Sequence, residues 1–313
     1  MKLVVQIPCY NEEDNISKVL EAIPKKIKGI KEIKIVLIDD NSTDNTVNIA
    51  KNYDIEIIKL NSKKGLSAVF TRGVIWALNN KADILVNLDG DNQYQASNIE
   101  KLIEPILNNQ ADMVIGTRPI NKISSFSFFK KIMQKFGSLI VKLISNTEIK
   151  DASSGFRAFN KESLLKLNIF NDFTYTIESI IQAKNKNLVI KNVEIEINEQ
   201  KNRKSRLFKN DFDYIFKQAK NLIRFFIVYR PARFFTFLAT ILFLIGFSIG
   251  LRFLYFYFNL NGTGHIQSLI LCAIILILSF ICFMLAILGD LFSINRKILE
   301  EIQYEIRLNK YKK

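Results

Sequence analysis

The sequence predicts an α/β domain with a mostly parallel sheet and helices on both faces, followed by two membrane-spanning helices. Three observations lead to this fold class. Short apolar runs rich in β-branched residues alternate with helical patterns through residues 1–120. These runs are nearly continuous, as in strands that are buried on both faces of a sheet. Two long segments without a charged residue lie near the C-terminus.

Strand and helix signals follow one another in regular order. The first run, KLVVQIP, has the composition of a strand, and after it apolar residues recur at helical spacing at Ile16, Val19, Leu20 and Ile23. The second helix signal begins with Ser and Thr capping residues and an acid. We expect strands at 2–8, 34–40, 55–60, 83–89 and 112–117, and helices at 11–27, 42–53, 66–80 and 99–107.

The two charge-free segments run from Phe234 to Leu251 and from Ile266 to Gly289. With its flank beyond Arg252, the first segment matches the second at roughly 24 residues, about 36 Å as a helix, which is enough to cross a bilayer core of about 30 Å. A core helix that is apolar on all faces is the alternative, but two such segments joined by a few polar residues favour a membrane hairpin. The first residues, MKLVVQIPCYNEE, do not have the pattern of a signal peptide.

The net charge of +14 is concentrated beside these segments. Between Lys201 and Arg233 there are ten Lys or Arg against two Asp, and the tail after Leu291 is also basic. This distribution is typical of a cytoplasmic face against anionic lipid, and the globular part has no basic motif that would indicate nucleic-acid binding. The connecting loop NLNGTGH has no Lys or Arg. We therefore expect a plasma-membrane or inner-membrane protein with its globular domain and both termini in the cytoplasm.

Three polar loops directly follow predicted strands: PCYNEE, DDNSTD and DGDNQ. Because the carboxyl ends of parallel strands meet at one edge of a sheet, we expect the three loops to lie together. In the last of them Asp89 and Asp91 are separated only by Gly90, which lets the backbone bend so that both carboxylates can turn toward one ion. Two carboxylates without neighbouring His or Cys suit a hard divalent cation, Mg²⁺ in particular, with the remaining ligands supplied by a diphosphate.

The rest of the inventory excludes several chemistries. The only histidine is His265, in the predicted outer loop, so the globular part has no Ser-His-Asp triad and no histidine metal cluster. Neither a GxxxxGK[ST] loop nor a GxGxxG motif after the first strand is present. Carboxylates, a divalent metal and basic residues remain, and they fit transfer of a group away from a metal-bound nucleoside diphosphate.

At this point the sequence resembles a known family. The stretches IPCYNEEDNI, IDDNSTDNT, KGLSAVFTRG and LDGDNQ are similar to the GT-A domain of family 2 glycosyltransferases. The stretches DASSGFRAFNKE, FTYTIESIIQAKNKNLVIKNVEI and RKSRLF resemble the polyprenyl-phosphate glycosyltransferases, the dolichol-phosphate mannose synthase-like group. The resemblance covers nearly the whole chain, including the paired C-terminal spans.

The resemblance implies roles for individual residues. Asp91, Asp89, Asp151 and Arg157 would form the catalytic group, and Asp89, Asp91 and Gln93 would hold Mg²⁺ or Mn²⁺. The nucleotide-sugar would be bound by Pro8, Tyr10, Asn11, Glu12, Asp40, Asp89, Gly90, Asp91, Gln93 and Arg118. The acceptor phosphate would be met by Ser154, Lys131, Arg203, Ser205 and Arg206. Gly90 stands where relatives often have Ala or Leu, which would leave this loop more flexible.

Four parts of the chain follow from these patterns: a GT-A domain at 1–200, a basic interface segment at 201–232, a transmembrane hairpin at 233–291 and a basic cytoplasmic tail at 292–313. From Leu207 to Phe226 apolar residues form a helical stripe with basic residues between them. Such a stripe is typical of a helix lying in the membrane interface, and a helix packed on the globular domain is the alternative.

We expect a metal-dependent enzyme that transfers a sugar, with inversion, from a UDP- or GDP-linked donor to a membrane polyprenyl phosphate. A membrane glycosyltransferase with another glycan or lipid acceptor and a non-catalytic scaffold that binds nucleotide-sugars are the alternatives. A processive polysaccharide synthase would need a QxxRW motif, and the only tryptophan, Trp76, lies in VIWAL. The sequence leaves open the sugar, the base, the polyprenol length, the choice between Mg²⁺ and Mn²⁺, a partner flippase and whether the protein is a homo-oligomer.

Overall fold

The computed structural model describes residues 1–119, 148–170, 175–198, 220, 223–224, 226–259 and 265–312. The chain forms two compact units, one made of residues 1–215 with 303–313 and the other of residues 216–302. Each unit is described by itself. The segment expected to form an interfacial helix, from Leu207 to Phe226, lies largely outside the described residues.

The first unit is built on one seven-stranded sheet with the order β3-β2-β1-β4-β6-β5-β7. Its strands are β1 (Lys2–Cys9), β2 (Glu32–Asp39), β3 (Glu56–Lys59), β4 (Ile84–Asn87), β5 (Met113–Thr117), β6 (Arg157–Asn160) and β7 (Ile190–Glu194). Only β6 runs antiparallel to its neighbours, β4 and β5. The predicted mostly parallel sheet is therefore confirmed, and the sequence did not reveal its one antiparallel strand.

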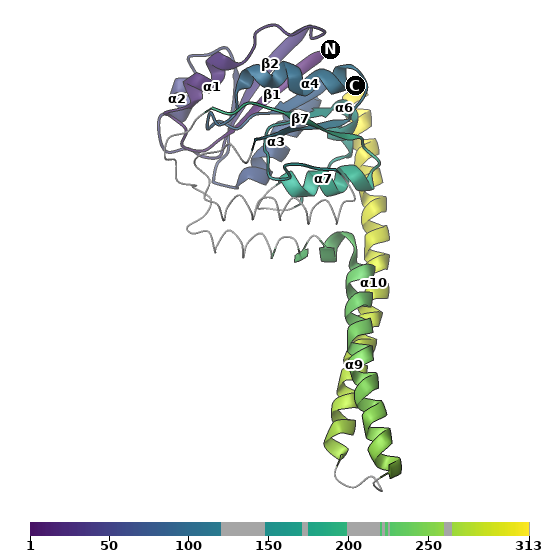
Figure 1. The fold of residues 1–313 in the computed structure, drawn as a ribbon. Helices are drawn as coiled ribbons and strands as arrows, with labels where there is room; N and C mark the ends of the chain where they lie inside the picture. The colour runs from purple at the N-terminus through teal and green to yellow at the C-terminus, as the bar shows by residue number, and fades with distance from the viewer. Residues whose placement is uncertain are drawn as a thin grey trace. The chain divides into compact units, whose positions relative to one another are not determined.

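Helices cover both faces of the sheet, as Figure 1 shows. They are α1 (Ile16–Ala22), α2 (Thr46–Ala50), α3 (Leu66–Asn79), α4 (Ile99–Leu107), α6 (Lys161–Lys166) and α7 (Tyr175–Asn185), with a 3₁₀ turn at Ala96–Asn98. The alternation of β1 separates the two layers. Leu3, Val5 and Ile7 join the core cluster that contains the buried residues of α1 and α4, whereas Gln6 lies against Gly73 of α3 on the opposite face.

Two helices are shorter than the sequence predicted, for local reasons. Helix α1 ends at Ala22 because Ile23, which precedes Pro24, adopts an extended ψ of 126°, as residues before proline usually do. Helix α2 begins only at Thr46, because the residues before it form a loop in which Asp44 accepts a hydrogen bond from the Thr46 amide at 3.0 Å.

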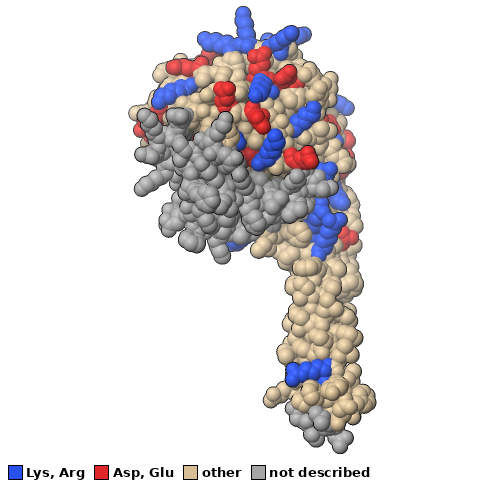
Figure 2. All heavy atoms as spheres, viewed as in Figure 1, with Lys and Arg blue, Asp and Glu red and all other residues tan. Residues whose placement is uncertain are grey.

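The second unit contains helix α9 (Pro231–Asn259) and most of helix α10 (Ile266–Lys312). Both are long and apolar enough to cross a membrane, with mean hydropathy of 2.3 and 3.2 in their most apolar windows. Most of their surface bears no charge on the face seen in Figure 2, whereas acids and bases are interspersed over the α/β unit. These two apolar helices suggest a membrane anchor.

Small residues let α9 and α10 pack closely. A Cβ at Gly246 would lie 2.9 Å from the Leu276 side chain, so a larger residue here would force Leu276 to shift. The Cys272 thiol donates to the Gly246 carbonyl at 3.1 Å, and the Ser279 hydroxyl donates to the Ala239 carbonyl at 2.8 Å. Close packing of small residues with hydrogen bonds across helices is how helix pairs associate in lipid.

The last turns of α10 belong to the α/β unit. Arg307 donates from Nη1 to the carbonyl oxygens of Leu167 at 2.7 Å and Leu165 at 3.3 Å, at the C-terminal end of α6. The Tyr311 hydroxyl donates to the Ala82 carbonyl at 3.4 Å, and Lys161 lies 5.1 Å from the centre of the Tyr311 ring. The end of the chain is therefore part of the α/β unit, where the sequence predicted only a basic tail.

Replacing Arg307 by Met should lower the stability of the α/β unit. The change keeps the aliphatic stem but leaves the two carbonyls at the end of α6 without their cationic donor, at a cost of about 1–2 kcal/mol for a partly exposed charged hydrogen bond. The apparent unfolding midpoint of the purified protein in detergent measures this loss. Lys310→Met, at an exposed position of the same helix, is the control and should leave the midpoint unchanged; equal shifts in both variants would contradict the assigned role of Arg307.

Candidate active site

Three polar loops meet at the carboxyl edge of the sheet. Register explains why: Cys9 at the end of β1 pairs with Asp39 at the end of β2, and Gln6 of β1 pairs with Asn87 at the end of β4. The first two loops are also tied directly, because the Asn11 amide donates to the Ser42 hydroxyl at 2.9 Å. The structure thus brings together the loops that the sequence placed together.

The loop after β1 is held by the start of α2. The backbone amide of Glu12 donates to the Thr46 hydroxyl at 2.7 Å, and Asn15 donates to the Glu12 carboxylate at 3.2 Å. Tyr10, between them and the end of β1, is half-buried, and the Lys63 ammonium lies 3.6 Å from the centre of its ring. Pro8 is the last but one residue of β1 and is buried.

Asp40, expected near the nucleotide base, has partners that the sequence did not suggest. Its carboxylate accepts from the backbone amides of Lys64 at 2.7 Å and Gly65 at 3.0 Å. Gly65 has a φ of 88°, which favours glycine at this position before α3. Asp40 therefore fixes the loop that leads into α3, and it does so from within the same loop cluster.

The acid pair follows β4. Asp89 and Asp91 are both partly exposed, and Gln93 beside them is also partly exposed. The Gln93 amide donates to Asp91 Oδ1 at 3.0 Å and Asn87 donates to Asp89 Oδ1 at 3.3 Å. Desolvation and the neighbouring charge of Asp91 raise the pKa of Asp89 to about 7. Two carboxylates in such an environment repel each other, and a cation between them would relieve that repulsion.

Gly90 is required for a close approach. An added Cβ would lie 2.5 Å from the Cys9 sulfur and 3.2 Å from the Pro8 carbonyl. Its φ is not positive, so contact with β1, and not the backbone freedom that the sequence suggested, explains glycine at this position.

Gly90→Ala should therefore destabilise the protein and disturb the acid pair. Overpacking of this kind costs about 1–3 kcal/mol, and the unfolding midpoint together with the affinity of the acid pair for a divalent cation would show both effects. Cys9→Ala removes the sulfur that the new methyl group meets, so the double variant should regain most of the loss. Equal losses in the native and Cys9→Ala backgrounds would contradict the contact.

A further loop, residues 151–156, lies against Asp89 of the acid pair. A Cβ at Gly155 would be 2.5 Å from Asp89 Oδ2, so the glycine backbone is packed directly on the carboxylate. The Gly155 peptide is held on both sides: its amide donates to the Tyr94 hydroxyl at 3.1 Å, and its carbonyl accepts from the Tyr175 hydroxyl at 2.9 Å and from Asn87 at 2.9 Å.

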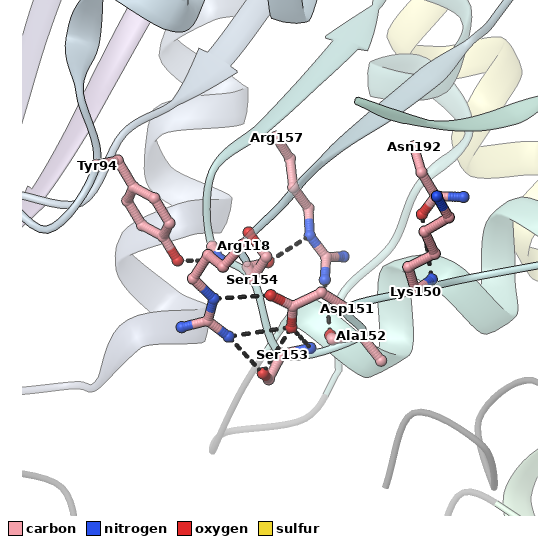
Figure 3. A network of polar contacts seen from close by, with 10 residues as sticks. Tyr94, Arg118, Lys150, Asp151, Ala152, Ser153, Ser154, Arg157 and Asn192 are labelled. Atoms are coloured by element: carbon pink, nitrogen blue, oxygen red, sulfur yellow. Dashed lines mark hydrogen bonds and ion pairs between the residues drawn. The ribbon is translucent and has the colours of Figure 1, made fainter. Parts of the chain in front are cut away.

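Two buried arginines fix this loop (Figure 3). Arg118 binds both oxygens of Asp151, at 2.7 and 3.0 Å, and donates to the Ser153 hydroxyl at 2.7 Å. Burial opposes ionisation of Asp151, but the charge and hydrogen bonds of Arg118 outweigh it and lower the pKa of that carboxyl. Arg157 donates to the backbone carbonyls of Ala152 at 2.8 Å and Ser154 at 2.7 Å on one side, and to the Thr176 carbonyl at 2.6 Å on the other. Arg118 directly follows β5 and Arg157 begins β6, so the loop is braced from both strands, and Arg157 also ties it to α7 through the Thr176 carbonyl.

Burial separates the expected site residues into two groups. Asp151, Ser154 and Arg157 are 0% exposed and Arg118 is 7% exposed, whereas Asp89 and Asp91 are partly exposed. Desolvation lowers the pKa of Arg157 to about 10. We infer that the buried group positions the loop that lies against Asp89. The expected phosphate ligands Lys131, Arg203, Ser205 and Arg206 lie outside the described residues.

Four residues with direct contacts at the site were missed by the sequence reasoning: Asn87, Tyr94, Gly155 and Tyr175. Gly155 and Tyr175 lie inside stretches that were singled out for the resemblance, but the sequence gives no sign that they touch each other. Asn87 and Tyr94 lie on either side of the acid pair, and nothing in the sequence pointed to their contacts.

The residues at the edge of the sheet suit a hard divalent cation. Asp89 and Asp91 offer carboxylate oxygens and Gln93 offers an amide oxygen, which are the donors that Mg²⁺ and Mn²⁺ prefer. In the part of the chain that the structure describes, no third Asp, Glu, His or Cys completes a metal cluster. Two carboxylates leave room for phosphate oxygens of a ligand, so the donor set fits a metal shared with a diphosphate.

Comparison with known proteins identifies the family. The model of glycosyl transferase family 2 matches residues 4–167, which include the loops described above. The chain belongs to glycosyltransferase family 2. This family 2 glycosyltransferase is 32% identical over 194 residues to a dolichol-phosphate mannosyltransferase of Pyrococcus furiosus, covering 59% of this chain and 53% of that protein. It therefore spans about half of the length of that relative.

Two other relatives are also named as glycosyltransferases of a polyprenyl or dolichyl phosphate. An undecaprenyl-phosphate mannosyltransferase of Micrococcus luteus is 26% identical, covering 54% of this chain and 70% of its own. A UDP-N-acetylglucosamine–dolichyl-phosphate N-acetylglucosaminyltransferase of Methanococcus voltae is 29% identical, covering 52% of this chain and 70% of its own. The predicted resemblance to polyprenyl-phosphate glycosyltransferases is confirmed.

A solved structure supports the fold. The glucosyl-3-phosphoglycerate synthase of Mycobacterium tuberculosis, determined with Mn²⁺, uridine diphosphate and glucosyl-3-phosphoglycerate, matches with a TM-score of 0.55 at 16% identity, over 72% of this chain and 78% of that one. The GT-A fold expected from the sequence is confirmed. Mn²⁺ and UDP are bound in the structure of that protein.

Proposed function

We propose that this family 2 glycosyltransferase transfers a sugar from a nucleotide-sugar to a membrane polyprenyl phosphate, with inversion at the anomeric carbon. The observation that carries the proposal is the acid pair at the carboxyl edge of the sheet: Asp89 and Asp91 are partly exposed and separated by one residue, and the loop at Gly155 packs against Asp89. The names of the relatives and the two apolar helices support the acceptor.

The donor would bind over the edge of the sheet. Tyr10 and Glu12 lie in the loop after β1 and Asp40 begins the loop after β2, where the nucleoside would sit. Asp89 and Asp91, with Gln93, would hold Mg²⁺ or Mn²⁺. When bound there, the cation would neutralise the charge that develops on the departing nucleoside diphosphate. The chain's own contribution is to hold the two carboxylates fixed, by the Gln93 amide on one side and by Asn87 and Gly155 on the other.

The acceptor phosphate would be the nucleophile. A phosphate monoester has a second pKa of about 6, so it is largely dianionic at neutral pH and needs little help from a base. One of its oxygens attacks the anomeric carbon, the bond from that carbon to the donor diphosphate breaks, and the nucleoside diphosphate leaves with the electron pair. Asp91 is the carboxylate that we expect to assist.

The membrane would present the lipid. In this proposal α9 and α10 span the plasma or inner membrane with both termini in the cytoplasm, because Lys and Arg are concentrated on one side of the hairpin. Arg203, Ser205, Arg206 and Lys131 would contribute positive charge and hydrogen bonds to the phosphates at the headgroup level.

The test uses the purified full-length protein in detergent with Mg²⁺ or Mn²⁺, a short-chain polyprenyl phosphate and a panel of UDP- and GDP-sugars. We expect nucleoside diphosphate release from one donor that depends on the lipid and is lost in Asp91→Asn. Asp54→Asn, at an exposed loop position, is the matched control and should retain native activity. Release that does not depend on polyprenyl phosphate would indicate a different acceptor, and binding of nucleotide-sugars without release of nucleoside diphosphate from any of them would favour the non-catalytic scaffold.

A further inference from the structure

Two buried amide side chains form a line from the centre of the sheet to the acid pair. Gln6, in the middle of β1, is 1% exposed, and Asn87, the last residue of β4, is 0% exposed. The parallel register sets the two opposite each other. Gln6 Nε2 donates to Asn87 Oδ1 at 2.8 Å, and Asn87 Nδ2 donates to Asp89 Oδ1 at 3.3 Å and to the Gly155 carbonyl at 2.9 Å.

The chemistry of the partners fixes the orientation of both amides. A carboxylate and a backbone carbonyl can only accept, so Asn87 must turn its NH₂ group toward Asp89 and Gly155. Its oxygen then faces β1, where Gln6 supplies the donor. If Gln6 were apolar, that oxygen would lack this donor, and the Asn87 amide would lose the contact that holds its plane.

This arrangement leaves one buried polar atom without a hydrogen bond among the described residues. Gln6 Oε1 is buried and, among the described residues, has no hydrogen-bond partner. It lies where a Cβ on Gly73 would be, at only 1.9 Å, so the side chain fills the space that this helical glycine leaves open. A buried acceptor without a partner is a cost that an apolar residue of similar size would avoid. The other end of the amide offers a reason for it.

We propose that Gln6 and Asn87 are positioning residues that fix the Asp89 carboxylate and the Gly155 peptide in the geometry for binding a divalent cation. The inference rests on the proposed function in so far as Asp89 holds that cation. Gln6 acts only through Asn87, and Asn87 acts on the carboxylate directly. Partners of metal ligands that fix their orientation affect metal affinity in this way.

A double-mutant cycle on metal affinity tests the inference. Mn²⁺ alone is titrated into the full-length protein in detergent, with free Mn²⁺ measured by electron paramagnetic resonance. We expect Asn87→Leu to weaken Mn²⁺ binding about 10-fold, within the usual range for such partners, and Gln6→Leu to weaken it less, about threefold. Because Gln6 acts through Asn87, adding Gln6→Leu to Asn87→Leu should cause no further loss.

Two further variants separate positioning from general damage. Gly73→Ala leaves every polar group in place but occupies the space of Gln6 Oε1, so it should reproduce the effect of Gln6→Leu on Mn²⁺ affinity. Gln182→Leu removes a buried amide of α7 that accepts from the Asn168 amide at 2.7 Å; it should lower the unfolding midpoint without changing Mn²⁺ affinity. Should Asn87→Leu fail to fold, Gly73→Ala and Gln6→Leu still test whether the Gln6 side chain affects Mn²⁺ affinity through Asn87.

The outcomes are distinct. Native Mn²⁺ affinity in Asn87→Leu, an equal loss from Gln6→Leu in both backgrounds, or an absence of Mn²⁺ binding by the native protein would each overturn the inference. The titration needs neither donor nor acceptor. A protein that binds Mn²⁺ with the expected cycle but does not modify polyprenyl phosphate would therefore refute the proposed function and leave the positioning role standing.

Discussion

Replacing Asp89 by Asn is expected to lower lipid-dependent nucleoside diphosphate release by at least about 100-fold, as removal of a central electrostatic group from an active site does. Asn has nearly the same shape, so the packing against Gly155 is kept while the negative charge is lost. The pair would then offer the cation one carboxylate in place of two. Because the pKa of Asp89 is raised to about 7 by burial and by Asp91, the substitution should not destabilise the folded protein.

The measurement is the initial rate at saturating donor and lipid, together with Mn²⁺ affinity and the unfolding midpoint. Glu100→Gln, an exposed acid in the first turn of α4, is the control for removing one negative charge near this edge and should behave as native. An Asp89→Asn variant that keeps more than a tenth of the native rate would contradict a metal-binding role for this side chain. Loss of the rate on adding a chelator, and its return with Mn²⁺, should accompany the result.

The second large effect is on stability. Asp151→Asn leaves the Arg118 guanidinium, with 6% of its side chain exposed, buried without its counter-charge. Breaking a buried ion pair by removing one partner costs about 3–5 kcal/mol, which corresponds to an apparent midpoint lower by about 6–20 °C for a domain of this size. Differential scanning calorimetry of the detergent-solubilised protein at a fixed heating rate measures this shift of the midpoint.

Removing both charges of the pair provides a control. Asp151→Leu combined with Arg118→Met removes both charges, and such apolar replacement of a buried pair is often neutral for stability. The double variant should therefore unfold close to the native protein even if it is inactive, since the loop at Gly155 would lose its brace. A double variant as unstable as Asp151→Asn would show that the pair contributes through something other than its mutual charge.

Much of the fold could be predicted from the sequence because its main strands are buried on both faces. β1, β2 and β4 appear as continuous apolar runs, and α4 has apolar residues on one face only, so both kinds of element were predicted within a few residues. β6 was missed for a physical reason: its four residues, RAFN, include the buried Arg157, and no pattern in such a short segment indicates an antiparallel direction.

The candidate site was also predicted only in part from the sequence. The spacing of Asp89 and Asp91 at the end of a strand was enough to predict an acid pair, because local backbone geometry brings the two side chains together. The partners of the pair could not be predicted, since Gly155 and Asn87 are 68 residues apart and meet only through the order of the strands. Arg118 and Asp151 were both singled out, but only the folded chain shows that they bind each other.

One measurement tests the central claim most directly: mass spectrometry of the lipid fraction after reaction with the donor that gives nucleoside diphosphate release. The account predicts a polyprenyl phosphate heavier by one glycosyl unit, formed in equal amount with the nucleoside diphosphate and absent from Asp91→Asn and from reactions with a chelator. Nucleoside diphosphate release with the lipid left unmodified would contradict it.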